Sequence, residues 1–255
     1  MRGLKGKVAI VTGGGGGIGR ATCQRLGEEG CIVGVFDINE ESANETAKLI
    51  NDAGGTAHAY IVDITDYDVV KAGVDAFEAA AGHGTDVLVN NAGWDKVVPF
   101  LAAERDLWKR VIDINLYGPL NMHYAVLPGM VERRGGRVIN IASDAGRVGS
   151  SGEAVYSACK GGIASFSKTL SRELVRHNIL LNTVCPGPTD TALLADVTSG
   201  EAGKRIIDAM TKAVPMRRIG TPDDYPGIIA FLASDDAGFI VGQTISVSGG
   251  LTMSG

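Results

Sequence analysis

The stretch Thr12–Gly19, TGGGGGIG, separates an apolar run from a helical pattern. The apolar run, Val8 to Val11, is typical of a strand buried on both faces of a parallel sheet, and residues 20–29 have the pattern of a helix. Glycines let the backbone approach a pyrophosphate closely, and the free N–H groups at the start of a helix then meet its negative charge. A glycine cluster alone is more often a plain turn, but its position between a strand and a helix predicts a dinucleotide-binding loop.

An acidic residue, Asp37, ends the next predicted strand, Ile32 to Phe36. It lies about 20 residues beyond the glycine loop, where dinucleotide-binding folds place a carboxylate on the adenosine ribose. Such a carboxylate accepts hydrogen bonds from ribose hydroxyls and repels a 2′-phosphate, and no basic residue follows it directly. The sequence therefore favours NAD over NADP. An acid that only caps the next helix is the alternative that stays open.

Strand and helix patterns alternate along the rest of the chain. We expect strands at 57–62, 86–90, 137–143, 179–184 and 244–248, and helices at 40–53, 66–81 and 223–232. We also expect a helical region at 107–131 that is interrupted near Pro119 and at Pro128, and a helix through Tyr156 that ends near residue 177. The alternation predicts one α/β domain over residues 1–255, a Rossmann-like, doubly wound parallel sheet with helices on both faces.

Ligands of such sheets bind at the carboxyl ends of the strands. The predicted strands deliver Gly13, Asp37, Asp63 and Asn91 to that edge, and a later strand delivers Ser143. We therefore expect the binding site there.

Composition excludes several classes of protein. The chain has 255 residues and a net charge of −5, which argues against nucleic acid as a main partner. No apolar run reaches the length of a membrane span, and the N-terminal residues do not resemble a secretory signal. The four cysteines are scattered without metal-type spacing, so we expect reduced thiols, no metal site and a cytoplasmic protein.

Tyr156 and Lys160 are four residues apart, so on a helix their side chains share one face. A phenol is a poor base near neutrality, because its ordinary pKa is about 10. A cation held close favours the phenolate and lowers that pKa, which suits proton exchange with an alcohol or a carbonyl. Taken alone, the pair is more often two residues on a helix surface. The upstream nucleotide loop, together with Ser143 and Asn115, favours the catalytic interpretation.

The sequence resembles the short-chain dehydrogenase/reductase family from Lys7 to about Gly250. The motifs that carry the resemblance are TGxxxGIG at 12–19, NNAG at 90–93, Asn115, Ser143, YxxxK at 156–160 and Pro186-Gly187. Each motif is weak alone, but together, in this order and spacing, they are highly specific.

The resemblance implies a role for each matching residue. Tyr156 is expected to be the general acid/base, Ser143 to bond the substrate oxygen, Lys160 to lower the pKa of Tyr156 and bind the nicotinamide ribose, and Asn115 to hold a water in a proton relay. Other residues are expected to contact the cofactor: Gly13, Gly16, Gly17, Ile18, Gly19, Asp37, Ile38, Asp63, Ile64, Asn91, Ala92, Gly93, Pro186, Gly187, Thr189 and Thr191. Ser143 as a turn residue and Asn115 as a satisfied buried amide are the alternatives.

Two positions depart from the family pattern. Thr189 stands where relatives often have an aliphatic residue, and Ser248-Gly249-Gly250 stands where they often have Asp-Gly-Gly. Neither departure touches the proton-transfer group, so the expected activity is unchanged.

The substrate is less well determined, because a family fixes the reaction more than the substrate. The segments 140–156, 185–191 and 248–253 resemble those of 2-hydroxycyclohexanecarboxyl-CoA dehydrogenases, which implies oxidation of an alicyclic 3-hydroxyacyl-CoA in anaerobic aromatic-acid degradation. Near relatives act on free secondary alcohols, 3-oxoacyl thioesters and hydroxysteroids, so these stay as alternatives. The candidate pocket residues are Trp94, Asp95, Asp144, Arg147, Ser150 and Glu153, although Arg147 in a surface or subunit ion pair is the more ordinary interpretation.

Residues 189–215 are expected to form a mixed stretch that closes over the site as a lid. Its cations Lys204, Arg205 and Lys212, with Arg217 and Arg218 beyond, suit the phosphates of coenzyme A, although such a cluster is usually a solvated helix face. His123 is expected to pack at a subunit contact. Family members pair their long helices into dimers and tetramers, which implies a homotetramer.

Two other classes of protein share part of this pattern. A non-catalytic NAD-sensing regulator could keep the glycine loop and Asp37, but it has little use for Tyr156, Lys160 and Ser143 together. A Rossmann-fold methyltransferase also lacks that set. We therefore expect an NAD-dependent oxidoreductase that interconverts a secondary alcohol and a ketone.

Overall fold

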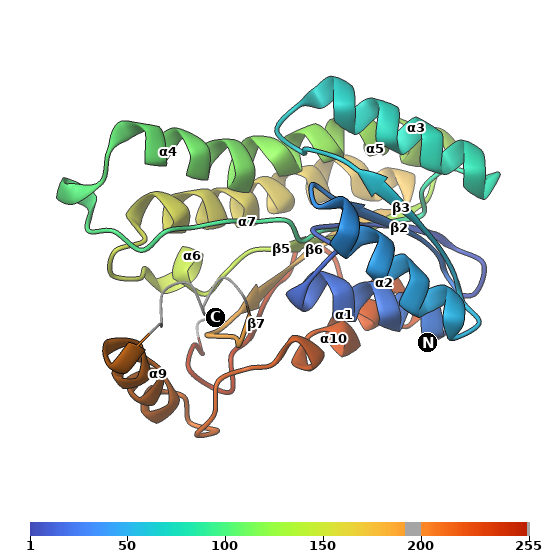
Figure 1. The fold of residues 1–255 in the computed structure, drawn as a ribbon. Coiled ribbons are helices and arrows are strands. Elements are labelled where there is room, and N and C mark those ends of the chain that lie inside the picture. The colour runs from blue at the N-terminus through green and yellow to red at the C-terminus, as the bar shows by residue number, and fades with distance from the viewer. Residues whose placement is uncertain (192–199, 254–255) are drawn as a thin grey trace.

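A parallel sheet of seven strands forms the centre of the computed structural model, which describes residues 1–191 and 200–253 (Figure 1). The strand order is β3-β2-β1-β4-β5-β6-β7, and every neighbouring pair is parallel. The chain therefore winds outward from β1 in one direction and then from β4 in the other. This order confirms the predicted doubly wound sheet.

The strands are short and largely buried, as parallel strands covered on both faces are. Their bounds are β1 Val8–Thr12, β2 Ile32–Asp37, β3 Thr56–Ile61, β4 Val87–Asn90, β5 Gly136–Ile141, β6 Ile179–Pro186 and β7 Thr244–Val247. The helices between them are α1 Gly17–Glu28, α2 Glu40–Asp52, α3 Tyr67–Ala81, α4 Arg105–Ile112, α5 Gly118–Arg133, α6 Ala145–Val148, α7 Ala154–Leu174, α9 Gly200–Ala213 and α10 Pro226–Ala233.

Helices cover both faces of the sheet, and each face has its own hydrophobic core. On one face α1, α2 and α10 pack together, with Leu26 and Ile229 fully buried. On the other face lie α3, α4, α5 and α7, and Phe77 and Met122 are buried beneath them (Figure 1). The sheet is therefore the middle layer of three, and its carboxyl edge is left for a ligand.

Of the two breaks predicted in the long helical region, the structure has one. The region is interrupted just before Pro119 by a π-helical turn, Asp113–Tyr117, which is the break that the sequence indicated. The second predicted break, at Pro128, is wrong: Pro128 lies inside α5, which continues to Arg133. Burial of Met122, Val126 and Met130 on both sides of the proline holds the helix together despite the lost backbone hydrogen bond.

The predicted mixed stretch at 189–215 contains a helix of 14 residues, α9. In Figure 1, α9 lies at the lower left, apart from the two main helical layers. Part of the predicted lid, residues 192–199, lies outside the described residues. The closing of this segment over the site stays a prediction.

Two further expectations meet the structure here. His123, expected at a subunit contact, is only 2% exposed and lies inside the chain against Asn90, Asn140 and Phe166. That expectation is therefore wrong, because the face of α5 that carries His123 faces the sheet. All four cysteines are free and buried. Within the described ranges, no helix is both long and apolar enough to cross a lipid bilayer.

Candidate active site

In the loop that links β1 to α1, different glycines are required by different features of the backbone and its surroundings. Gly13 and Gly17 have φ angles of 63° and 49°, in the left-handed region that favours glycine. A Cβ on Gly19 would lie 2.0 Å from the backbone oxygen of Gly13, so only glycine fits there. A Cβ on Gly16 would meet nothing within 4 Å, because this residue faces open space. We call Gly13–Gly19 together with Asp37 the nucleotide cradle.

Asp37 ends β2 beside this loop. Its carboxylate accepts hydrogen bonds from the backbone N–H groups of Gly15 and Asn39, both at 2.9 Å. These bonds fix the carboxylate at the mouth of the loop, where it lines the main cavity of the molecule. The helix-capping alternative is not supported, because the N-cap side chain of α2 belongs to Asn39.

The main cavity has a volume of about 720 Å³, enough for a large part of a dinucleotide. It runs along the carboxyl edge of the sheet, and half of its lining residues had been predicted as cofactor contacts. The predicted residues that line it are Gly13, Gly16, Asp37, Ile38, Asp63, Ile64, Ala92 and Gly93.

These residues fit an NAD(P) cofactor. Open space beside Gly16 admits a pyrophosphate at the start of α1, where a larger side chain would fill it. Asp37 would hold the adenosine ribose, and Asp63 and Ile64 would flank the adenine. When bound, the nicotinamide ring supplies the hydride chemistry.

The proton-transfer cluster, which we define as Ser143, Tyr156, Lys160 and Asn115, is assembled from three elements. Ser143 follows β5, Tyr156 and Lys160 lie on α7, and Asn115 lies in the π-helical turn. Ser143 and Tyr156 share a side-chain hydrogen bond. The Nζ of Lys160 is 5.5 Å from the centre of the Tyr156 ring and donates to the backbone oxygen of Ile141 at 3.0 Å. The structure therefore brings all four predicted catalytic residues together, and their roles stay predictions.

Burial raises the pKa of Tyr156 and lowers the pKa of Lys160, so it favours the neutral form of both side chains. The pKa of Tyr156 is raised, first because the phenol is buried and then because of the nearby Glu153, whereas the bond with Ser143 lowers it. The pKa of Lys160 is lowered to about 8, because its ammonium is buried. Burial, Glu153 and Ser143 have the largest effects on the pKa of Tyr156, and the predicted lowering by Lys160 stays a prediction.

Asn115 is held tightly by backbone groups. Its amide nitrogen donates to the oxygens of Trp94 and Val111, at 2.6 and 2.9 Å, and its oxygen accepts from the N–H of Trp94 at 3.3 Å. A Cβ on Gly93 would lie 3.0 Å from the Asn115 oxygen and 3.2 Å from the Lys160 ammonium. The π-helical turn thus brings Asn115 close to Lys160, as such turns often do at functional sites. The predicted water relay stays a prediction.

The residues that follow β6 lie across from the glycine loop. The hydroxyl of Thr189 bonds to the oxygen of Gly187 at 2.8 Å and to the hydroxyl of Tyr225 at 2.5 Å. Thr191 lies beside Gly17, since a Cβ there would be 3.4 Å from the Thr191 methyl group. Pro186 ends β6. None of these four predicted residues is among those that line the main cavity, so their contact with the nicotinamide end of the cofactor stays a prediction.

Two predicted substrate residues are engaged with β7. Ser246 donates to the carboxylate of Asp144, and Arg147 donates to the hydroxyl of Ser246 at 2.8 Å. Asp144 is also only 5% exposed. These bonds attach α6 to the sheet, so both residues have a structural role, and their contact with substrate stays a prediction.

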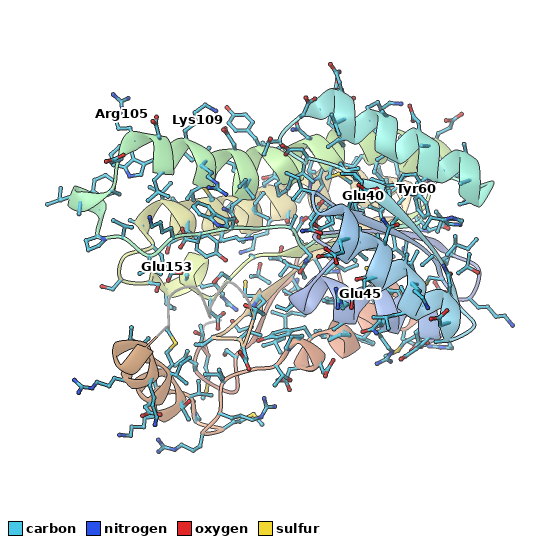
Figure 2. All side chains as sticks on the ribbon, in the orientation of Figure 1. Glu40, Glu45, Tyr60, Arg105, Lys109 and Glu153 are labelled. Carbon is cyan, nitrogen blue, oxygen red and sulfur yellow. The ribbon has the colours of Figure 1, made fainter. Side chains whose placement is uncertain are left out.

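Several cavity residues escaped the sequence analysis. They come from the loop between β3 and α3, from α4 and from the π-helical turn, and they are Val62, Thr65, Asp106, Lys109, Arg110, Asp113 and Ile114. The guanidinium of Arg110 lies 3.9 Å from the centre of the Trp94 ring, so the predicted residue Trp94 is held by an unpredicted one. Figure 2 labels Lys109 on α4, where it pairs with Asp113. The mixed charges of α4 were the available signal, but they are equally typical of a solvated helix.

Comparison with known proteins extends over the whole chain. The family model described as short chain dehydrogenase matches residues 7–202. The (3R)-3-hydroxyacyl-CoA dehydrogenase of Homo sapiens is 33% identical over 258 residues, covering 98% of this chain and 97% of the relative. The acetoacetyl-CoA reductase of Shinella zoogloeoides is 39% identical over 244 residues, covering 96% and 98%. The 3-oxoacyl-[acyl-carrier-protein] reductase of Chlamydia muridarum is 38% identical over 250 residues, covering 97% and 98%.

A solved structure described as NAD⁺-bound xylitol dehydrogenase superposes with a TM-score of 0.93 at 32% identity, covering 98% of this chain and all of the other. The family match leaves no support for a regulator without catalysis or for a methyltransferase. The chain belongs to the short chain dehydrogenase family and is an oxidoreductase that acts on CH–OH groups with NAD(P).

Proposed function

We propose that the protein is an NAD-linked dehydrogenase that interconverts a 3-hydroxyacyl thioester and its 3-oxo form. The observation that carries the proposal is the set of full-length relatives named for acyl thioesters, at 33% to 39% identity. NAD is favoured over NADP because Asp37 is fixed at the end of β2 and lines the cofactor cavity.

The proton-transfer cluster supplies what such a reaction needs. In oxidation, Tyr156 takes the hydroxyl proton of the substrate while Ser143 donates a hydrogen bond to the same oxygen. In reduction, Tyr156 returns that proton to the carbonyl oxygen. Lys160 adds positive charge beside the phenol, at 5.5 Å from its ring.

Within this class, we propose 2-hydroxycyclohexanecarboxyl-CoA as the first substrate to test. The segments 140–156, 185–191 and 248–253 resemble those of the dehydrogenases of that compound, and the first contains Ser143 and Tyr156 of the proton-transfer cluster. The alicyclic ring would lie near Trp94, which contributes an apolar face to the cavity.

Cations on α9 are the candidates for the phosphates of coenzyme A. Lys204, Arg205 and Lys212 are exposed there. The guanidinium groups of the next two cations are bonded nearby: Arg217 donates to the oxygen of Lys212 at 2.7 Å, and Arg218 pairs with Asp224 at 2.6 Å. We therefore assign the carrier contact to α9 rather than to the loop that follows it.

A free secondary alcohol is the second candidate substrate. The superposition with the NAD⁺-bound xylitol dehydrogenase structure favours it, since that protein is named for a sugar alcohol. A free alcohol needs no contact with the cations of α9.

The test is NADH formation with a panel that contains 2-hydroxycyclohexanecarboxyl-CoA, 3-hydroxybutyryl-CoA, the two free acids and xylitol. We expect kcat/KM for the thioesters to exceed that for the free compounds by at least about 100-fold, because the carrier supplies binding energy away from the reacting carbon. A variant with Lys204 and Arg205 both changed to Gln should raise KM for the thioesters and leave the free alcohols unchanged. Equal kcat/KM for xylitol would overturn the thioester proposal.

We also propose a cytoplasmic homotetramer. Tyr117 and Tyr124, at 56% and 72% exposure, give the α4–α5 region the apolar surface that a subunit contact needs. Light scattering coupled to size exclusion should give four chains per particle, and a monomer would contradict it.

A further inference from the structure

Two carboxyl groups lie beside Tyr156 and have no part in the chemistry described so far. Asp95 belongs to the loop after β4, and Glu153 immediately precedes α7 (Figure 2). Their side chains are hydrogen-bonded to each other. Both are half-buried, and both line a small cavity of about 20 Å³ that Tyr156 also lines.

The two loops that carry these carboxyl groups are fastened to each other. The N–H of Val98 donates to the oxygen of Gly152 at 2.9 Å. Gly152 has a φ of 82°, and a Cβ there would lie 2.7 Å from a methyl group of Val97. This close approach keeps Asp95 and Glu153 together at the first turn of α7, one turn before the phenol.

The surroundings of the pair are mostly apolar. The other walls of the small cavity come from Phe100, Leu107, Trp108 and Val111, and one oxygen of Asp95 is buried without a hydrogen-bond partner. Burial and Glu153 together raise the pKa of Asp95 to about 6.

Few other ionisable groups face the pair and the phenol. Lys160 on α7 attracts the Asp95 carboxylate, and Cys185 on β6 acts on Tyr156. Lys96 lines the same small cavity but is exposed. Glu153 and Asp95 both disfavour the phenolate of Tyr156, with Glu153 the stronger.

We propose that Glu153, paired with Asp95, is a positioning residue whose negative charge sets the pH at which Tyr156 gives up its proton. The pair carries more charge above about pH 6 and then holds the phenol in its protonated form. A protonated phenol is the form that donates to a carbonyl, so the pair favours reduction near neutral pH and moves oxidation to higher pH.

The test compares pH profiles of kcat/KM for Glu153→Gln and Glu153→Asp, with acetoacetyl-CoA in reduction and 3-hydroxybutyryl-CoA in oxidation. We expect Glu153→Gln to lower both midpoints by about one pH unit, so that oxidation at pH 7 rises several-fold. Glu153→Asp keeps the charge and should keep midpoints within about 0.3 unit of the parent. Glu173→Gln, an exposed change of the same charge on α7, is the matched control and should shift nothing.

A second measurement does not need turnover. Tyrosine labelled with ¹³C at Cζ can be titrated by NMR in the NAD⁺ complex, and the Tyr156 signal is assigned by its loss in Tyr156→Phe. The same downward shift is expected in Glu153→Gln. Unchanged midpoints in a folded Glu153→Gln variant would overturn the proposal, as would equal shifts in Glu153→Gln and Glu153→Asp.

The inference rests on the proposed reaction but not on its substrate. A wrong substrate would lower turnover in all variants alike and leave the NMR difference between them intact. A wrong role for Glu153 would remove that difference whatever the substrate.

Discussion

The nucleotide cradle presents backbone groups beside open space, whereas the proton-transfer cluster consists of side chains, two of which are buried. In the cradle, Gly16 faces open space, and Gly13 and Gly17 have positive φ angles that favour glycine. In the cluster, Lys160 is 4% exposed and Asn115 is fully buried. Because of this difference, substitutions in the cradle should change NAD binding and the geometry of the loop. Substitutions in the cluster should change kcat and the proton affinity of its side chains.

Removal of the phenol hydroxyl should give the largest effect. Tyr156→Phe is expected to lower kcat about 10³-fold, because a positioned acid/base is lost, and to leave the Kd for NAD within about twofold. Steady-state kinetics and calorimetric binding check the two values. Tyr60→Phe removes a hydroxyl on β3, 3.4 Å from the oxygen of Ala76, and is the control. A similar loss of kcat and NAD binding in Tyr156→Phe would erase the contrast between the two regions.

The buried ammonium of Lys160 should give the second largest effect, which is a dependence of the free energy of unfolding on pH. Below about pH 8 both the folded and the unfolded states protonate Lys160, so the folded state carries the full cost of the buried charge. Between about pH 8 and about 10.5 only the unfolded chain binds the proton, so this contribution makes stability rise with pH. Relative to Lys160→Met, the parent protein should gain about 3 kcal/mol across that window.

Urea unfolding of both proteins at several pH values measures this gain. Lys168→Met, on the same helix but exposed, should show no such dependence. A constant difference between the parent and Lys160→Met would mean that the ammonium is not buried in solution.

The cradle offers a matched pair of glycines. Gly19→Ala is expected to cost about 2 kcal/mol of stability and to weaken NAD binding, because its Cβ would lie 2.0 Å from the oxygen of Gly13. Gly16→Ala has free space for its methyl group and an extended φ of −158°, so its stability should be unchanged. It should still raise the Kd for NAD, since the methyl group enters the space for the pyrophosphate. Thermal unfolding with NAD titration separates the two, and equal losses of stability would contradict the contrast.

Positions at the edge of the sheet were easier to predict than the contacts around the proton-transfer cluster. The alternation of strands and helices fixes where strands end, so the positions of Gly13, Asp37 and Asn91 follow from local pattern. The bond between Asp95 and Glu153 joins loops 58 residues apart, and the bond between Asp144 and Ser246 joins elements 102 residues apart. Such contacts depend on how the layers pack, which periodicity does not encode.

Local rules also failed where tertiary packing outweighed them. Pro128 stays inside α5 because the flanking turns are buried, and residues 200–213 form a helix although their sequence indicated a mixed stretch. A histidine such as His123 occurs both at subunit interfaces and in protein cores, so its residue type does not distinguish the two. The orientation of α5 places it in the core. The proton-transfer motif was recognisable by its spacing, but the direction of the pKa shifts required the burial of each group.

The smallest expected effect concerns cofactor choice. Asp37→Ala should raise the Kd for NAD about tenfold, because two ribose hydroxyls lose a charged acceptor. The same change should weaken NADP less, or strengthen it, because the repulsion of a 2′-phosphate is removed with the carboxylate. Since Asp37 also accepts from the N–H of Gly15, Asp37→Asn is the control that keeps an acceptor for that bond. Equal losses of NAD and NADP binding in Asp37→Ala, with no loss in Asp37→Asn, would show that Asp37 holds the loop rather than the ribose, and the cradle would then recognise pyrophosphate alone.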